Sequence, residues 1–229
     1  MYNIDNERTE VFVMSNNNMI ITIDRQYGSG GHIIGQKLAE DLSIPFYDSE
    51  LLKEAAKESG ICEEIFESFD EKPTSSFLYS LVMDPFSLGY NNNSFDMPIN
   101  YKVFLASFDT IKNLAKQGPC VFVGRCADYA LSDLNLPFLS VYVKAPLDAR
   151  MKRAQEVYGV AENRCKEVLT KKDKERASYY NYYTSNRWGD AKSYDLCLDS
   201  SKYGIHGSVD LIRYAADLKM KRLQQNLEK

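Results

Sequence analysis

The sequence MIITIDRQYGSGGHIIGQKL (residues 19–38) joins an apolar run, a glycine-rich turn and an amphipathic segment. Residues 19–23 are almost continuously apolar and rich in isoleucine, which is typical of a strand buried on both faces of a parallel sheet. Apolar residues then recur at helical spacing over residues 33–42, with charges between them. A strand, a glycine turn and a helix in this order predict the opening βαβ unit of an α/β domain.

The glycine turn is a candidate phosphate-binding loop. Glycines allow backbone N–H groups to point inward around an anion, and the following helix N-terminus adds unpaired N–H groups and a positive dipole end. The alternative is a tight structural turn with glycines at positive φ. The candidate phosphate-binding residues are Arg25, Tyr27, Gly28, Ser29, Gly30, Gly31 and His32.

The turn departs from the GxxxxGK[ST] pattern of nucleoside triphosphate-binding loops. Gly31 stands at the lysine position and Arg25 at the first glycine. The lysine normally contacts the outer phosphates and the adjacent hydroxyl holds magnesium. Arg25, or arginines from elsewhere, are the candidates to replace the lysine. Lys37 lies too far along the helix, because each residue adds about 1.5 Å. Ser29 is a candidate hydroxyl, and the metal ligands stay unassigned.

The remaining pattern predicts one domain over residues 19–229, preceded by a polar extension at residues 1–18. Residues 72–100 are rich in Pro, Ser, Asn and Gly and predict a substrate-binding insert. The other expected helices are 49–60, 63–69, 102–116 and 208–223, and the expected extended segments are 45–47, 120–123, 138–143 and 196–198. This alternation predicts an α/β fold with a mostly parallel sheet flanked by helices.

Composition narrows the class of protein. The chain has 229 residues, a net charge of −4 and 44% hydrophobic residues, enough for one good core. It shows no secretory signal or membrane-length apolar run, which predicts a soluble cytoplasmic protein that does not bind membranes. Five widely spaced cysteines predict reduced core thiols. The two histidines lack metal-ligand spacing, so any metal is expected to arrive with phosphate.

Charge is unevenly distributed. The acidic balance argues against a nucleic-acid-binding protein. Residues 144–192, however, hold twelve Lys or Arg against seven Asp or Glu. This segment therefore predicts contact with a smaller anion.

Four stretches resemble the cytidylate kinase-like family, the divergent relatives of bacterial cytidylate kinases. They are IITIDRQYGSGGHIIGQKLAEDLSIPFYDSELL (20–52), VFVGRCADYAL (121–131), LSVYVKAPLDARMKRA (139–154) and DKERASYYNYYTSNRWGDAKSYDLCLDSS (173–201). The resemblance implies an ATP-dependent P-loop kinase fold with about five parallel strands, a substrate-binding insert and an arginine-rich helical lid over residues 150–192. It places Arg125 on the acceptor's phosphate, although an ordinary surface arginine is the alternative.

The lid stretch contributes further candidates. Arg150 and Arg153 stand three residues apart and share a helix face, and Asp173 and Arg176 repeat this spacing. Arginines closing over the transferred phosphoryl group would stabilise its charge. Solvated i,i+3 ion pairs such as Asp173 with Arg176 are the alternative. Arg187 joins as a substrate-binding candidate.

Two other features have competing interpretations. Asp48, at the end of the second strand, is a candidate substrate- or water-positioning carboxylate, or a helix cap. The cluster Tyr179, Tyr180, Tyr182, Tyr183 and Trp188 suits packing better than base stacking or a dimer interface.

The leading hypothesis is ATP- and magnesium-dependent phosphoryl transfer to a small phosphorylated acceptor, with a nucleoside monophosphate such as CMP first. The alternatives are a binding module for nucleotides or phosphometabolites without turnover, and a kinase with a non-nucleotide acceptor. A homodimer is left open.

Overall fold

The computed structural model describes residues 19–48, 99–124 and 126–227. Within them, five parallel strands form one sheet in the order β2-β3-β1-β4-β5. The strands are β1 (Ile20–Arg25), β2 (Phe46–Tyr47), β3 (Val121–Val123), β4 (Phe138–Lys144) and β5 (Leu196–Asp199). The predicted five-stranded parallel sheet of the P-loop type is therefore confirmed.

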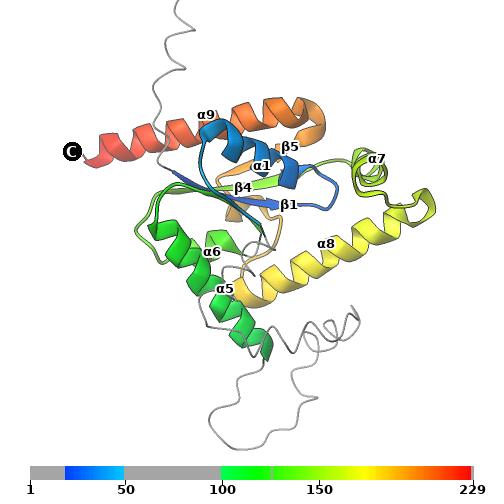
Figure 1. The fold of residues 1–229 in the computed structure, drawn as a ribbon, viewed down its shortest axis with the longest axis horizontal. Coiled ribbons are helices and arrows are strands. Elements are labelled where there is room, and N and C mark those ends of the chain that lie inside the picture. The colour runs from blue at the N-terminus through cyan, green and yellow to red at the C-terminus, as the bar shows by residue number, and fades with distance from the viewer. Residues whose placement is uncertain (1–18, 49–98, 125, 228–229) are drawn as a thin grey trace, which may run out of the picture.

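Helices cover both faces of the sheet (Figure 1). Helices α1 and α9 lie over one face, while α5, α6 and α8 lie over the other. The described helices are α1 (Gly31–Leu42), α5 (Ile99–Lys116), α6 (Ala127–Leu131), α7 (Leu147–Tyr158), α8 (Glu162–Thr184) and α9 (Ser200–Leu227), with a short 3-10 turn η1 (Ala191–Ser193). This is the three-layer arrangement that alternating strands and helices predict.

Strand β1 is central because its side chains pack on both faces. Ile21 and Ile23 are buried with α1 and α9, whereas Ile20 is buried with Phe122 and the helices of the opposite face. A strand with two buried faces favours a nearly continuous apolar run, as residues 19–23 have. The tyrosines at the end of α8 also join this second core, since Tyr180 is buried and Tyr179 and Tyr183 pack against it. The packing interpretation is correct for these three.

The first residues of two helices differ from the predicted ones. Helix α5 begins at Ile99, two residues inside the predicted insert. Helix α9 begins at Ser200, not at 208, and a non-helical Gly204 (φ 65°, ψ −175°) divides it into two parts. The sequence pattern revealed only the second part. The polar extension, the expected helices 49–60 and 63–69, insert residues 72–98 and Arg125 lie outside the described residues.

Three of the predicted core thiols, Cys120, Cys126 and Cys165, are buried, while Cys62 lies outside the described residues. Cys197 is exposed, contrary to the prediction, because β5 is an edge strand. In the part of the chain that the structure describes, none of the helices combines the length and the apolar character needed to cross a membrane.

The carboxyl ends of the parallel strands meet at one edge of the sheet. The glycine turn follows β1 at this edge. Strands β3 and β4 pair with β1 on its two sides, so the chain after β1 lies between the ends of its two neighbours. Ligands of open α/β sheets bind in the crevice at such a switch point. The fold therefore places the candidate phosphate-binding loop where a ligand is expected.

Candidate active site

The loop between β1 and α1 presents several N–H groups that have no acceptor among the described residues. Gly30 caps α1 in the left-handed conformation with φ 85°. The N–H groups of Tyr27 and Ser29 have acceptors, at Asp173 Oδ1 (2.7 Å) and Gln26 O (3.2 Å). Those of Gly28, Gly30 and His32 find no acceptor among the described residues. Unpaired donors beside a helix N-terminus form a site suited to phosphate.

Gly28 allows the loop to lie directly against α7. It has φ 77°, and a Cβ atom there would lie 2.6 Å from the carbonyl oxygen of Arg150. Such a separation is a clash with backbone, which cannot rotate away as a side chain can. Only glycine fits, so the loop and α7 are held in close contact.

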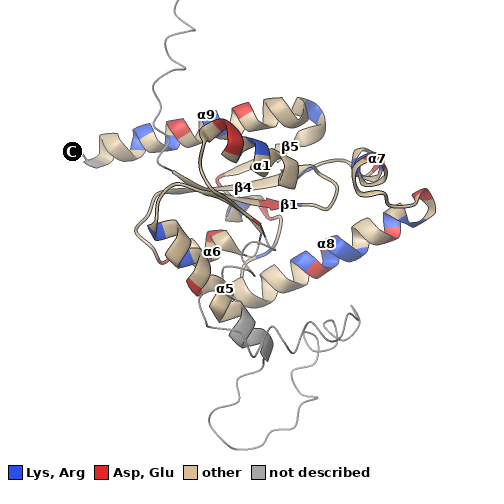
Figure 2. Ribbon diagram, viewed as in Figure 1, with Lys and Arg blue, Asp and Glu red and all other residues tan. Residues whose placement is uncertain are grey.

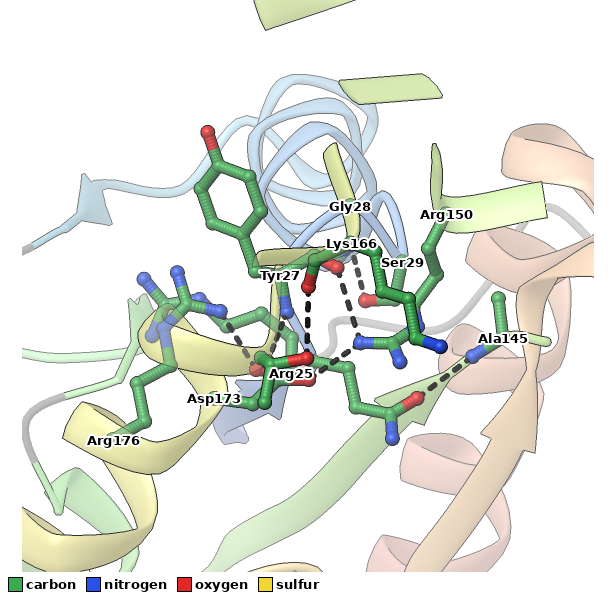
Figure 3. A network of polar contacts seen from close by, with 12 residues as sticks. Arg25, Tyr27, Gly28, Ser29, Ala145, Arg150, Lys166, Asp173 and Arg176 are labelled. Atoms are coloured by element: carbon green, nitrogen blue, oxygen red, sulfur yellow. Dashed lines mark hydrogen bonds and ion pairs between the residues drawn. The ribbon is translucent and has the colours of Figure 1, made fainter. Parts of the chain in front are cut away.

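Asp173 of α8 and Arg150 of α7 fix the first turn of the loop (Figure 3). One Asp173 oxygen accepts the Tyr27 N–H, and the other accepts from Arg150 Nη1 at 2.5 Å. The same Nη1 donates to the Tyr27 carbonyl at 3.4 Å. The Arg150 and Asp173 side chains are only 11% and 18% exposed, so this ion pair is largely shielded from solvent.

Arg153 and Arg176 contact the loop from the same two helices. Arg153 Nη1 donates to the Gly28 carbonyl at 2.8 Å. Arg176 Nη1 donates to the Arg25 carbonyl at 2.9 Å, and its guanidinium lies 5.5 Å from the centre of the Tyr27 ring. Arg150 and Arg153 thus share a face of α7 as their spacing predicts, and that face contacts the loop.

The loop lies in a positive environment. Basic residues occur along α7 and α8 (Figure 2), and three of their arginines donate to the loop or to its partner Asp173. Burial lowers the pKa of Arg176, an effect opposed by the charges of Asp173 and Asp24. The i,i+3 alternative fails for Asp173, because its ion pair is formed with Arg150 across two helices. The arrangement favours an anion above the loop.

Arg25 occupies the space that a side chain at position 31 would need. A Cβ atom on Gly31 would lie 2.5 Å from Arg25 Cβ and 3.0 Å from its Cγ. The Arg25 guanidinium extends as far as Gly124 at the end of β3, where an added Cβ would lie 2.0 Å from Nη1. Gly31 at the lysine position and Arg25 at the first position are therefore sterically linked.

On the β2 side of the loop, His32 and Asp48 form a polar pair. His32 Nε2 and Asp48 Oδ2 are 3.0 Å apart, with side chains 40% and 18% exposed. Phe46 meets the imidazole ring edge-on at 5.4 Å. The two residues were separate candidates in the sequence, and the structure joins them. Whether Asp48 also caps a helix falls outside the described residues.

The structure does not gather every candidate around the loop. Arg187 lies in the exposed turn after α8, where its carbonyl accepts from Asp190 N at 3.1 Å. Its substrate-binding role stays a prediction. Arg125, expected on the acceptor's phosphate, lies outside the described residues.

Several residues that form hydrogen bonds with the loop were not predicted from the sequence. Ser200 Oγ donates to the Ser29 carbonyl at 2.5 Å, and Gln26 Oε1 accepts from Ala145 N at 3.1 Å. Ser29 itself is fully buried, and its hydroxyl accepts from Gly31 N at 3.4 Å. Ser200 and Ala145 are too distant in sequence from their loop partners for a local pattern to reveal these contacts.

Asp24 was also missed. It is a buried carboxyl that accepts from Tyr194 Oη at 3.0 Å. A charged residue within an otherwise apolar strand was the available signal.

The fold and the loop together define a P-loop protein of the kinase type. The profile of the cytidylate kinase-like family matches residues 20–202. The chain belongs to the cytidylate kinase-like family.

Comparisons with individual proteins agree with this family. The cytidylate kinase of Methanocaldococcus jannaschii is 25% identical over 202 residues, covering 87% of this chain and 98% of that protein. The cytidylate kinase of Methanosarcina mazei is 26% identical over 202 residues, covering 87% and 97%. The crystal structure of an uncharacterized protein from Eubacterium ventriosum is 29% identical with a TM-score of 0.66, covering 87% of this chain and 99% of that one.

Proposed function

We propose that the protein transfers the terminal phosphoryl group of ATP to a small acceptor bound at the carboxyl edge of the sheet. One observation carries the proposal. Loop N–H groups without an acceptor among the described residues, and the side chains of Arg25, Arg150, Arg153 and Arg176, lie around one helix N-terminus. Phosphoryl transfer depends on positioning and charge stabilisation, which such an arrangement can supply.

The loop amides would hold the phosphates while arginine replaces the absent lysine. Arg25 is the leading replacement, because its side chain passes over Gly31 and reaches towards the end of β3. Its planar guanidinium can donate to two phosphate oxygens at once. Arg153 and Arg176 would add positive charge from the lid helices.

Magnesium would bind with the triphosphate and neutralise charge on its outer oxygens. Within residues 19–48, 99–124 and 126–227, no three His, Cys, Asp or Glu side chains form a metal-binding group. Magnesium commonly keeps several waters and takes phosphate oxygens in addition to one or two carboxylates. The site is compatible with an ion held chiefly by nucleotide and water.

The acceptor would lie over the ends of β2 and β3, near the His32–Asp48 pair and Arg125. A nucleoside monophosphate such as CMP is the first candidate, because the curated relatives are cytidylate kinases. Residues 72–100 would complete acceptor recognition. The cytoplasmic location and the homodimer stay predictions.

The second candidate function is a binding module that holds nucleotides or phosphometabolites without turnover. Gly31 favours it, because a loop without its lysine lacks one contact to the transferred group. A kinase with a non-nucleotide acceptor is the third possibility. The three functions differ in ADP formation and in the phosphorylated product.

The test is incubation with ATP and magnesium plus a panel of nucleoside monophosphates and small phosphorylated metabolites. ADP and the phosphorylated acceptor are followed by mass spectrometry. We expect acceptor-dependent ADP that is lost in Arg125→Ala and retained in Arg164→Ala, an exposed arginine of α8. ATP binding without phosphorylation of any panel member would favour the binding module.

A further inference from the structure

Two buried carboxyl groups and two tyrosines form a polar cluster below the phosphate loop. Tyr180 Oη donates to Asp128 Oδ2 at 2.6 Å, and Tyr194 Oη donates to Asp24 Oδ2 at 3.0 Å. The two tyrosine rings are 6.3 Å apart and within 29° of parallel. The cluster links β1, α6, α8 and the segment before β5.

Both carboxyl groups are buried without an ion-pair partner among the described Lys and Arg residues. Asp24 and Asp128 are each 9% exposed. Burial and the charge of Asp128 raise the pKa of Asp24 to about 7, opposed by Arg25, Tyr194 and Arg176. Burial likewise raises the pKa of Asp128. An uncompensated buried carboxylate is costly, which favours the protonated form.

The position of Asp24 connects this cluster to the arginines of the loop. Asp24 directly precedes Arg25, and Arg176 lies one helical turn before Tyr180 on the same face of α8. Both guanidinium groups are close enough for their charges to act on Asp24. The other ionisable groups that interact with Asp24 are Asp128, Tyr194, Tyr180 and Tyr142.

We propose that Asp24 is a positioning residue whose charge state sets how strongly Arg25 and Arg176 attract the phosphates of ATP. When the Asp24 carboxyl is uncharged, it does not reduce the attraction between the two guanidinium groups and the phosphates of the nucleotide. The ionised carboxylate attracts those groups and repels the phosphates through the poorly polarisable interior. ATP therefore binds more weakly as pH rises through neutrality. This inference rests on the proposed function, because it requires ATP at the loop.

The test compares the full chain with Asp24→Asn, which removes the charge and keeps an oxygen acceptor for Tyr194. The dissociation constant of magnesium–AMPPNP is measured by calorimetry between pH 6 and pH 8.5. We expect wild-type affinity to fall about tenfold over this range, the equivalent of one pKa unit. Asp24→Asn should lose most of this fall and bind more tightly than wild type at pH 8.5.

The matched control is Asp133→Asn, which removes a carboxylate that is 79% exposed and should leave the wild-type profile unchanged. Protonation of the nucleotide affects every variant equally, so it cancels in the ratio of their dissociation constants at each pH. Tyr194→Phe is a second test of the inference. The tyrosine hydroxyl stabilises the ionised carboxylate, so its removal should raise the pKa of Asp24 and move the midpoint of the profile to higher pH.

A purely structural role would lower the stability of Asp24→Asn without altering its pH profile. An identical profile in wild type and Asp24→Asn would therefore overturn the inference alone, as would an unmoved midpoint in Tyr194→Phe. Failure of wild type to bind AMPPNP at any pH would overturn both this inference and the proposed function.

Discussion

The two sides of the phosphate loop differ in how they are built. On the lid side, Asp173, Arg150 and Arg153 contact Tyr27 and Gly28 through largely buried hydrogen bonds and an ion pair. On the β2 side, the described residues offer one pair, His32–Asp48, whose imidazole is 40% exposed. Among the described residues, the lid side is thus held by several mutually dependent contacts, and the β2 side contributes the partly exposed His32–Asp48 pair.

This difference suggests that the two sides of the loop serve different steps, phosphate binding on the lid side and acceptor recognition on the β2 side. A glycine-rich loop at a helix N-terminus binds phosphate in proteins that act on different substrates. Recognition of the acceptor depends on side chains that vary without disturbing the loop. Substitutions on the lid side should therefore alter stability and ATP binding, whereas those on the β2 side should alter the acceptor step.

The largest effect is expected from Gly28→Ala. The new Cβ would meet the Arg150 carbonyl at 2.6 Å, so the loop must move away from α7. We expect a loss of about 3 kcal/mol or more in the free energy of unfolding and at least about 100-fold weaker ATP binding. Chemical denaturation and calorimetry measure the two quantities.

Gly159→Ala is the matched control, because Gly159 also has positive φ (63°) but no atom lies within 4 Å of an added Cβ. Because alanine is strained in the left-handed conformation, this variant should lose about 1 kcal/mol in the free energy of unfolding. Its ATP affinity should be unchanged. Equal losses in the two variants would show that backbone strain, and not contact with α7, explains the Gly28 result.

A smaller effect is expected from Asp173→Ala. The substitution leaves the Tyr27 N–H without its acceptor and Arg150 without its counter-ion. Removing one partner of a largely buried pair should cost about 2–3 kcal/mol of unfolding free energy. Glu156→Ala, which breaks the exposed Lys152–Glu156 pair, should cost less than about 0.5 kcal/mol in the same urea titration. Similar costs for both would contradict the special importance of the lid side.

The smallest effect on stability is expected from Asp48→Asn. Because the His32–Asp48 pair is partly exposed, its loss should change the free energy of unfolding by less than about 1 kcal/mol. ATP affinity should stay within about threefold of wild type, while the KM for the acceptor should rise about tenfold, the equivalent of one lost hydrogen bond. A large loss of ATP affinity would remove the distinction between the two sides.

Periodicity and local motifs predicted the fold well. The isoleucine run of β1 was recognisable because both faces of the strand are buried. The spacing of Arg150 and Arg153 predicted a shared helix face, since helical geometry follows directly from sequence separation. These features depend on residues close together in the chain.

Contacts between segments that are distant in the sequence could not be predicted from periodicity or local motifs. The alternative partner of Asp173 was Arg176, three residues away, whereas its ion-pair partner is Arg150 on another helix. That choice depends on how α7 and α8 pack. Asp24 and Tyr194 are 170 residues apart, and their contact depends on the order of the strands.

The most direct test of the central claim, that this lysine-free loop binds the outer phosphates of ATP, is calorimetric titration of the full chain with magnesium–ATP and, separately, with AMP. The account predicts that ATP binds at least about tenfold more tightly than AMP, because the loop amides and arginines contact phosphates that AMP lacks. Equal affinities for both nucleotides, or no binding of ATP, would contradict it.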